Sequence, residues 1–313
     1  GSNPETALVG GITTAETTQR RITLQVYENA GVAIDDYPLQ AFIPLPYGVY
    51  GANLPNGTQT LLTSAEIAQT FVIKDSRDGA ALPAQYWVRS RWHALDNSIK
   101  ELVAIFKATD IPAYAGRGTT GDPAPIEYFF EHGVSPPPTT PVTATADANL
   151  ITVSNGDVVF TINKANFNFL DSISYKGTEV INNGIEDGHY VINRFNNSYK
   201  DSQPCTTKVP TNFVIEEAGP VRARIRVERA AYFVQDTNDS CYGPDKFNET
   251  PEPVPGFVVW FDLYHDSDQI VVNHNILNNA ITAYRSDLGQ TGYGLDGWPL
   301  FFQESGIQFQ IAL

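Results

Sequence analysis

The chain has 313 residues, 42% of them hydrophobic and 18% charged, which is enough apolar material for packed cores and too little charge for a disordered chain. Thirty-five acidic residues against 20 lysines and arginines give a net charge of -15, so nucleic acids and anionic membranes would meet repulsion over most of the surface. No run approaches the ~20 consecutive apolar residues of a membrane-spanning helix. We therefore expect a folded protein with no nucleic-acid partner and no membrane span.

The first part of the chain is typical of short β-strands. Ile22, Leu24 and Val26 alternate with polar residues, as one buried face of a strand requires. Residues 41–48 contain two prolines, which favours an edge strand or a loop over a central strand.

A hairpin is predicted next. Residues 71–73 are apolar, a turn follows at Asp78-Gly79, and residues 85–89 resume a strand pattern. A capping-box pattern at residues 63–66 predicts one short helix. Very little other helix is expected, so the fold class is all-β.

A segment rich in proline and threonine divides the chain. Four prolines within residues 136–141 prevent ladder hydrogen bonds and favour an extended connection. The sequence therefore predicts an N-terminal β domain over 1–134, a linker over 135–148 and a second β domain over 149–313.

Two antiparallel strand pairs are predicted in the second domain. Residues 151–153 and 158–162 flank Gly156, which suits a tight turn. Residues 258–264 and 269–274 form the second pair.

The last seven residues, 307–313, also alternate between apolar and polar. A strand that is free at a terminus can extend the sheet of another chain. We therefore expect the partners to include copies of this chain.

A basic row lies on one predicted strand. Arg222, Arg224 and Arg226 alternate with apolar residues, so they share one face. One interpretation is cross-strand pairing with carboxylates. The alternative is that the row binds an acidic sugar or the acidic face of another subunit.

An extracellular or cell-surface location is expected from two further features. Cys205 and Cys241 are compatible with one disulfide that closes a long loop, and two free buried thiols are the alternative. Four N-x-Ser/Thr sequons in turn-rich sequence are candidate glycosylation sites: Asn56, Asn196, Asn238 and Asn248.

Several short motifs occur in a fixed order along the chain: Ile43-Pro44-Leu45-Pro46-Tyr47-Gly48, residues 82–86, residues 92–103, residues 154–156, residues 160–164, residues 169–171 and residues 217–223. In this order they resemble the exo-rhamnogalacturonan lyase-like family, which is related to RIFT barrels. The resemblance implies a RIFT-like barrel followed by a β-sandwich. The stretch Trp92 to Ser98 departs from the family's tight Asp-Gly turn. In that family the lyase chemistry is attributed to a helical toroid, which this sequence lacks, so no catalytic residue is carried over.

No catalytic centre is predicted from the residues themselves. The five histidines are scattered without zinc-ligand spacing, although His265 and His274 flank one predicted hairpin and could meet. Nucleophile-elbow, P-loop and dinucleotide motifs are absent from the sequence. Carboxylate pairs for glycoside hydrolysis could be formed from Glu216, Glu217, Asp262, Asp266 and Asp268. A chain with 35 acidic residues also contains many such pairs by chance.

The sequence offers candidate residues for two kinds of binding site, one for carbohydrate and one for calcium. Tryptophans can stack on sugar rings or pack in a core, and we select Trp92 and Trp298, with the three arginines of the basic row, as carbohydrate-binding candidates. An oxygen-rich loop is a candidate calcium site, with an Asx turn as the alternative: Asp236, Asn238 and Asp239. No other metal or cofactor is expected.

These features favour a non-catalytic extracellular structural protein, a filament or surface-layer subunit that assembles through terminal strands. Two alternatives stay open. The chain could be the N-terminal β region of a polysaccharide lyase, or it could be a carbohydrate-binding module that recognises a polysaccharide.

Overall fold

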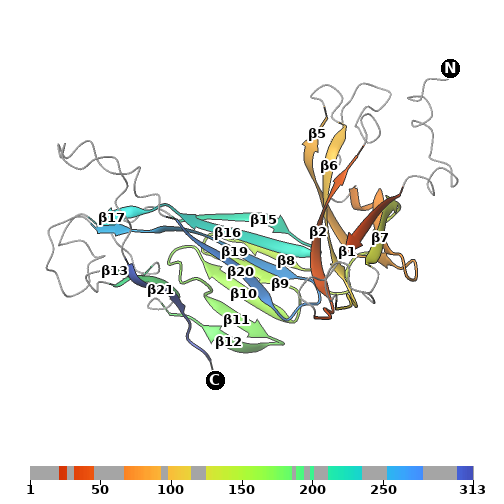
Figure 1. Cartoon of the computed structure of the whole chain (residues 1–313). Coiled ribbons are helices and arrows are strands. Elements are labelled where there is room, and N and C mark those ends of the chain that lie inside the picture. Colours follow the sequence, from red (N-terminus) through yellow and green to blue (C-terminus); the bar gives the residue numbers. More distant parts are fainter. Residues whose placement is uncertain are drawn as a thin grey trace, which may run out of the picture. The chain divides into compact units, whose positions relative to one another are not determined.

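The computed structural model describes residues 21–26, 32–45, 67–92, 98–113, 125–184, 188–193, 198–200, 211–234, 252–277 and 302–312. The regular secondary structure of this part of the chain is almost entirely β-strand (Figure 1), which confirms the predicted fold class. Helical backbone is confined, within it, to Ile67 and Ala68. The predicted capping box at 63–66 lies outside the described residues. No described helix is long and apolar enough to cross a membrane.

The chain divides into two compact units, Gly1–Pro138 and Thr139–Leu313. The division falls inside the segment 135–148 that was predicted to be a linker. Only part of that segment is a simple connection, because Thr143–Ala146 forms a strand and the neighbouring Val142 is buried in the second core. These residues contain no proline after position 141, so the backbone donors needed for a ladder are present.

Seven described strands build the first unit. They are β1 Ile22–Val26, β2 Tyr37–Pro44, β3 Phe71–Asp75, β4 Ala81–Leu82, β5 Ala84–Arg91, β6 Ile99–Ala108 and β7 Ile126–His132. One sheet has the order β1-β7-β3-β4, the other has the order β2-β6-β5, and neighbouring strands are antiparallel. Strand β2, which carries the two prolines Pro38 and Pro44, lies at an edge, as prolines require.

The hairpin predicted in this unit is wrong in its second strand. Strand β3 pairs with the short β4, with Ile73 opposite Leu82, across a turn in which Gly79 has a φ of 76°. The chain then passes through Pro83 into β5, which pairs with β6 in the other sheet. Pro83 has no N–H to continue the ladder with β3, which explains why the hairpin ends there.

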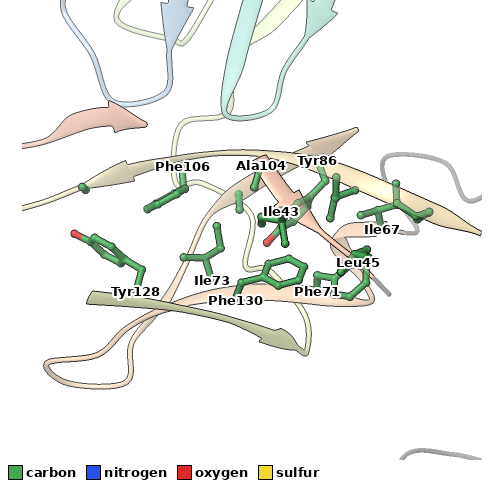
Figure 2. Packing of buried hydrophobic residues seen from close by; sticks show 14 of the residues in the cluster. Ile43, Leu45, Ile67, Phe71, Ile73, Tyr86, Ala104, Phe106, Tyr128 and Phe130 are labelled. Carbon is green, nitrogen blue, oxygen red and sulfur yellow. The ribbon is translucent and has the colours of Figure 1, made fainter. Parts of the chain in front are cut away.

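An apolar core lies between the two sheets among the described residues of the first unit, and Figure 2 shows side chains from both sheets within it. Phe71 and Phe130 stack with ring centroids 4.8 Å apart, and Tyr86 meets Phe130 edge-on at 6.3 Å. Ile22, Leu24 and Val26 pack against this core, which confirms their predicted inward face. Closure into a RIFT-like barrel remains a prediction.

Fourteen described strands build the second unit. They are β8 Thr143–Ala146, β9 Leu150–Ser154, β10 Val158–Asn163, β11 Ser172–Tyr175, β12 Thr178–Asn182, β13 Gly188–Asn193, β14 Ser198–Lys200, β15 Asn212–Ala218, β16 Arg222–Arg229, β17 Tyr232–Val234, β18 Glu252–Val254, β19 Gly256–Tyr264, β20 Ile270–Leu277 and β21 Phe302–Gln308. A five-stranded sheet, β12-β11-β10-β9-β8, and a four-stranded sheet, β15-β16-β19-β20, form a sandwich (Figure 1). The smaller sheets are β14-β13-β21 and β17-β18.

Both predicted strand pairs of this unit are confirmed. Strands β9 and β10 form a hairpin, with Gly156 at a φ of 95° in its turn. Strands β19 and β20 pair over their length, with Gly256 opposite Leu277 and Leu263 opposite Ile270.

The C-terminal strand pairs with other strands of the same chain, which corrects the prediction that it is free to join another chain. Strand β21 begins at Phe302, before the predicted start at residue 307, and pairs with β13. The chain then continues to the edge of β12, where the Asn182 N–H donates to the Gln310 carbonyl and the Ala312 N–H donates to the Val180 carbonyl. The alternating pattern of residues 307–313 therefore reflects pairing within the chain.

Candidate functional site

The outer face of the four-stranded sheet carries the largest organised set of polar side chains predicted from the sequence. Ala223, Ile225 and Val227 of β16 lie in the core of the sandwich. The intervening residues therefore face outward, because side chains alternate along a strand. Arg222, Arg224 and Arg226 thus form a row on the outer face, as predicted.

Each arginine of this row pairs with a carboxylate, which confirms the cross-strand interpretation. Arg224 donates two hydrogen bonds to the Asp262 carboxylate of β19, from Nε to Oδ1 at 2.7 Å and from Nη2 to Oδ2 at 2.5 Å. Arg222 Nε donates to Glu217 at 2.9 Å, and Arg226 Nε donates to Glu216 at 2.7 Å.

The pKa values of the charged groups in the row are shifted by their partners in the ion pairs. The Asp262 carboxylate hydrogen-bonds Arg224 and raises the pKa of that guanidinium. The pKa of Glu228 is lowered, first by a hydrogen bond from Asn212 and then by one from Arg226. The carboxylates proposed for glycoside hydrolysis include Glu217 and Asp262, and both are engaged in these pairs.

Trp260 lies beside this row, on the outer face of β19. Its core-facing neighbours are Val259 and Phe261, so its own side chain points the other way. Across the ladder it is opposite Arg226 on one side and Asn273 on the other. A depression of about 540 Å³ opens here, and it is lined by Arg224, Trp260, Val272, Asn273, His274 and Asn275.

Strand β20 forms one edge of the same sheet. Its sequence, Ile-Val-Val-Asn-His-Asn-Ile-Leu, has no acidic residue, lysine, arginine or proline over eight residues. Val271, Val272 and Ile276 are 37 to 40% exposed. No described strand pairs with the outer edge of β20.

The two histidines that flank the predicted hairpin, His265 and His274, do not meet. His274 is opposite Val259, whereas His265 follows the far end of β19, six residues further along. At about 3.3 Å per residue this register separates them by roughly 20 Å. His274 instead packs against His189 of β13, with ring centroids 4.8 Å apart, and His265 Nδ1 lies 2.8 Å from Asp266.

Trp92 was predicted, with the arginine row, to bind carbohydrate, and it belongs to the first unit. Its indole N–H donates to the Leu45 carbonyl at 2.8 Å, and the Lys100 ammonium lies 5.1 Å from the ring centroid. The structure therefore gives Trp92 a role in fixing the end of β2. The arginine row belongs to the second unit.

Several predicted residues lie outside the described part of the chain. They are Trp298, the cysteines Cys205 and Cys241, the sequons at Asn56, Asn196, Asn238 and Asn248, and the calcium candidates Asp236, Asn238 and Asp239. Within the described residues, no group of three or more His, Cys, Asp or Glu side chains is placed to hold a metal ion.

Comparison with models of known protein families finds no match, and comparison with curated protein sequences finds none. The site must therefore be interpreted from its geometry. Sequence reasoning did not select Trp260, Asn273 or Asn275. The available signal was the alternation of Trp260 with Val259 and Phe261, which places this tryptophan outside the core.

Proposed function

We propose that the protein is a non-catalytic extracellular structural subunit that assembles with copies of itself by strand addition at the β20 edge. The observation that carries this proposal is the exposed, uncharged edge of β20. An unpaired edge presents a row of N–H and C=O groups that another strand can complete.

Other long edge strands of the described sheets carry features that discourage such pairing. Strand β2 has two prolines, β5 has Arg89 and Arg91, and β15 has Glu216 and Glu217 with a bulge between Ile215 and Glu217. Charges, prolines and bulges are the usual means of protecting a sheet edge. Among the edge strands that the structure describes, β20 is the longest that has none of them.

The partner is taken to be a second copy because the edge offers main-chain hydrogen bonds and aliphatic side chains, with no charge to select a different protein. Two arrangements are open to such an edge. Pairing of β20 with β20 would close a two-fold dimer, whereas addition of a neighbour's terminal strand would propagate as a filament. The second arrangement fits the proposed structural role.

A substitution on this edge tests the proposal. We expect Val271→Lys and Ile276→Lys each to weaken self-association by about tenfold or more, because a lysine on an edge strand opposes addition of a further strand. The measurement is light scattering coupled to size exclusion, from low micromolar to near-millimolar protein, with electron microscopy of the concentrated sample.

Val180→Lys is the matched control. Val180 is 38% exposed on β12, but its edge is already occupied by the chain's own C-terminal residues, so this change should leave association intact. Electron microscopy separates the two arrangements, because a β20 dimer gives discrete particles whereas addition of a neighbour's terminal strand gives filaments. A protein that stays monomeric at every concentration, or that assembles equally well with lysine on β20, would refute the proposal.

A further inference from the structure

The depression beside Trp260 has the composition of a sugar-binding surface. Trp260 is half-buried on the outer face, opposite Asn273 of the neighbouring strand. Asn275 lies two residues further along β20 and shares that face, about 7 Å from Asn273. An aromatic ring is therefore bordered by two exposed amides. This is an arrangement in which a sugar ring can stack while its hydroxyl groups are hydrogen-bonded.

The polar groups of this surface have no partners within the described part of the chain. The Trp260 indole N–H and the side-chain amides of Asn273 and Asn275 make no hydrogen bond to it. An amide presents one acceptor and two donors, which matches the donor and acceptor capacity of adjacent hydroxyl groups. Among the described residues, nothing occupies the hydrogen-bonding capacity that these groups would offer to a ligand.

The charges around the depression select the ligand class. Three guanidiniums of the row, from Arg222, Arg224 and Arg226, face four carboxylates, from Glu216, Glu217, Glu228 and Asp262. The arginines are therefore neutralised locally, and the chain as a whole carries a net charge of -15. An acidic sugar would find no free cation in this row, whereas an uncharged sugar meets no electrostatic penalty.

We infer that the outer face of β19 and β20 binds a neutral oligosaccharide, with Trp260 as the stacking platform and Asn273 and Asn275 as hydrogen-bonding residues. The volume of about 540 Å³ is within the range of small-ligand sites. This inference is independent of the proposed assembly, because it rests on the face of the sheet and not on its edge.

Calorimetric titration with sugars of equal length tests the inference. The probes are cellohexaose, mannohexaose and xylohexaose, which are neutral, and hexagalacturonate, which is anionic. We expect at least one neutral hexasaccharide to bind and hexagalacturonate not to bind. Trp260→Ala should weaken binding by about tenfold or more, since one stacked aromatic ring typically contributes on the order of a factor of ten.

Two further variants keep the test sharp if Trp260→Ala fails to fold. Asn273→Ala alters only an exposed side chain and should also weaken binding, whereas Tyr175→Ala removes an exposed aromatic ring of the same unit on β11 and should not. Near-ultraviolet circular dichroism verifies the fold of each variant. Absence of binding by all three neutral sugars, binding of hexagalacturonate alone, or neutral-sugar binding unaffected by both Trp260→Ala and Asn273→Ala would overturn the inference.

Discussion

Asp262 is the residue on which the polar face depends most. It is 2% exposed, lies within an apolar strand between Phe261 and Leu263, and has its charge balanced by Arg224 alone among the described ion pairs. The sequence predicted that the arginines would share a face and pair with carboxylates. It could not identify Asp262 as the partner, because that assignment requires the register between β16 and β19.

Two arginines of one strand should differ in their contribution to stability. Arg224→Gln leaves the buried Asp262 carboxylate unpaired and should cost about 3 kcal/mol of the free energy of unfolding. Arg226→Gln breaks pairs with more exposed carboxylates and should cost about 1 kcal/mol or less. Urea denaturation measures both values.

A double variant provides the control for this difference. Arg224→Met combined with Asp262→Leu replaces the pair by apolar side chains of similar size and should recover most of the lost stability. Equal losses for the two single variants would contradict the assignment of Asp262 as the critical partner.

The sequence predicted hairpins whose two strands lie in one sheet, but it did not predict where the chain passes from one sheet to another. The β9–β10 and β19–β20 pairs follow from apolar runs on either side of a turn. The passage from β4 to β5 does not, because a local pattern cannot tell whether the next strand joins the same sheet. Strand β20 was predicted as a strand, but its place at an edge depends on the whole sheet order.

Glycines at two element boundaries should differ in their tolerance of a side chain. Gly188 opens β13 with a φ of 99°, and a Cβ there would lie 2.5 Å from the Asn168 backbone. Gly156 has a similar φ of 95°, but a Cβ there would meet nothing within 4 Å.

Gly156→Ala should therefore cost about 1 to 2 kcal/mol, which is the penalty of a left-handed backbone alone. Gly188→Ala also places its Cβ against the Asn168 backbone, which cannot move aside by changing a rotamer as a side chain can. It should therefore lower the free energy of unfolding by at least about 3 kcal/mol. Thermal and urea unfolding of the two variants give the comparison. A smaller loss for Gly188→Ala than for Gly156→Ala would show that Asn168 can move away.

The described residues form two apolar cores. One contains Phe106 and the other contains Phe261, and each belongs to a different compact unit. The composition of the chain indicated enough apolar material for a packed protein, and the prolines at 136–141 marked the region where the two units divide. The packing of residues 142–146 with the second unit was not visible in the sequence, because it depends on the partners in space.

Unfolding should therefore proceed in two transitions. Phe106→Ala should lower the melting temperature of one transition, and Phe261→Ala should lower that of the other, since each deletion of a buried phenylalanine costs about 3 to 5 kcal/mol in its own core. Differential scanning calorimetry resolves the transitions. A single transition that both variants shift equally would show that the two units unfold together.

The lack of charge and proline in β20 also has a consequence for the unfolded chain. Its aliphatic stretch, with two asparagines, has the composition from which stacked amyloid-like sheets grow once a segment is released from its native neighbours. Purification that exposes the second unit to heat or denaturant will therefore favour irreversible aggregation that begins at this strand, and gentle handling below its unfolding transition is what keeps the protein recoverable.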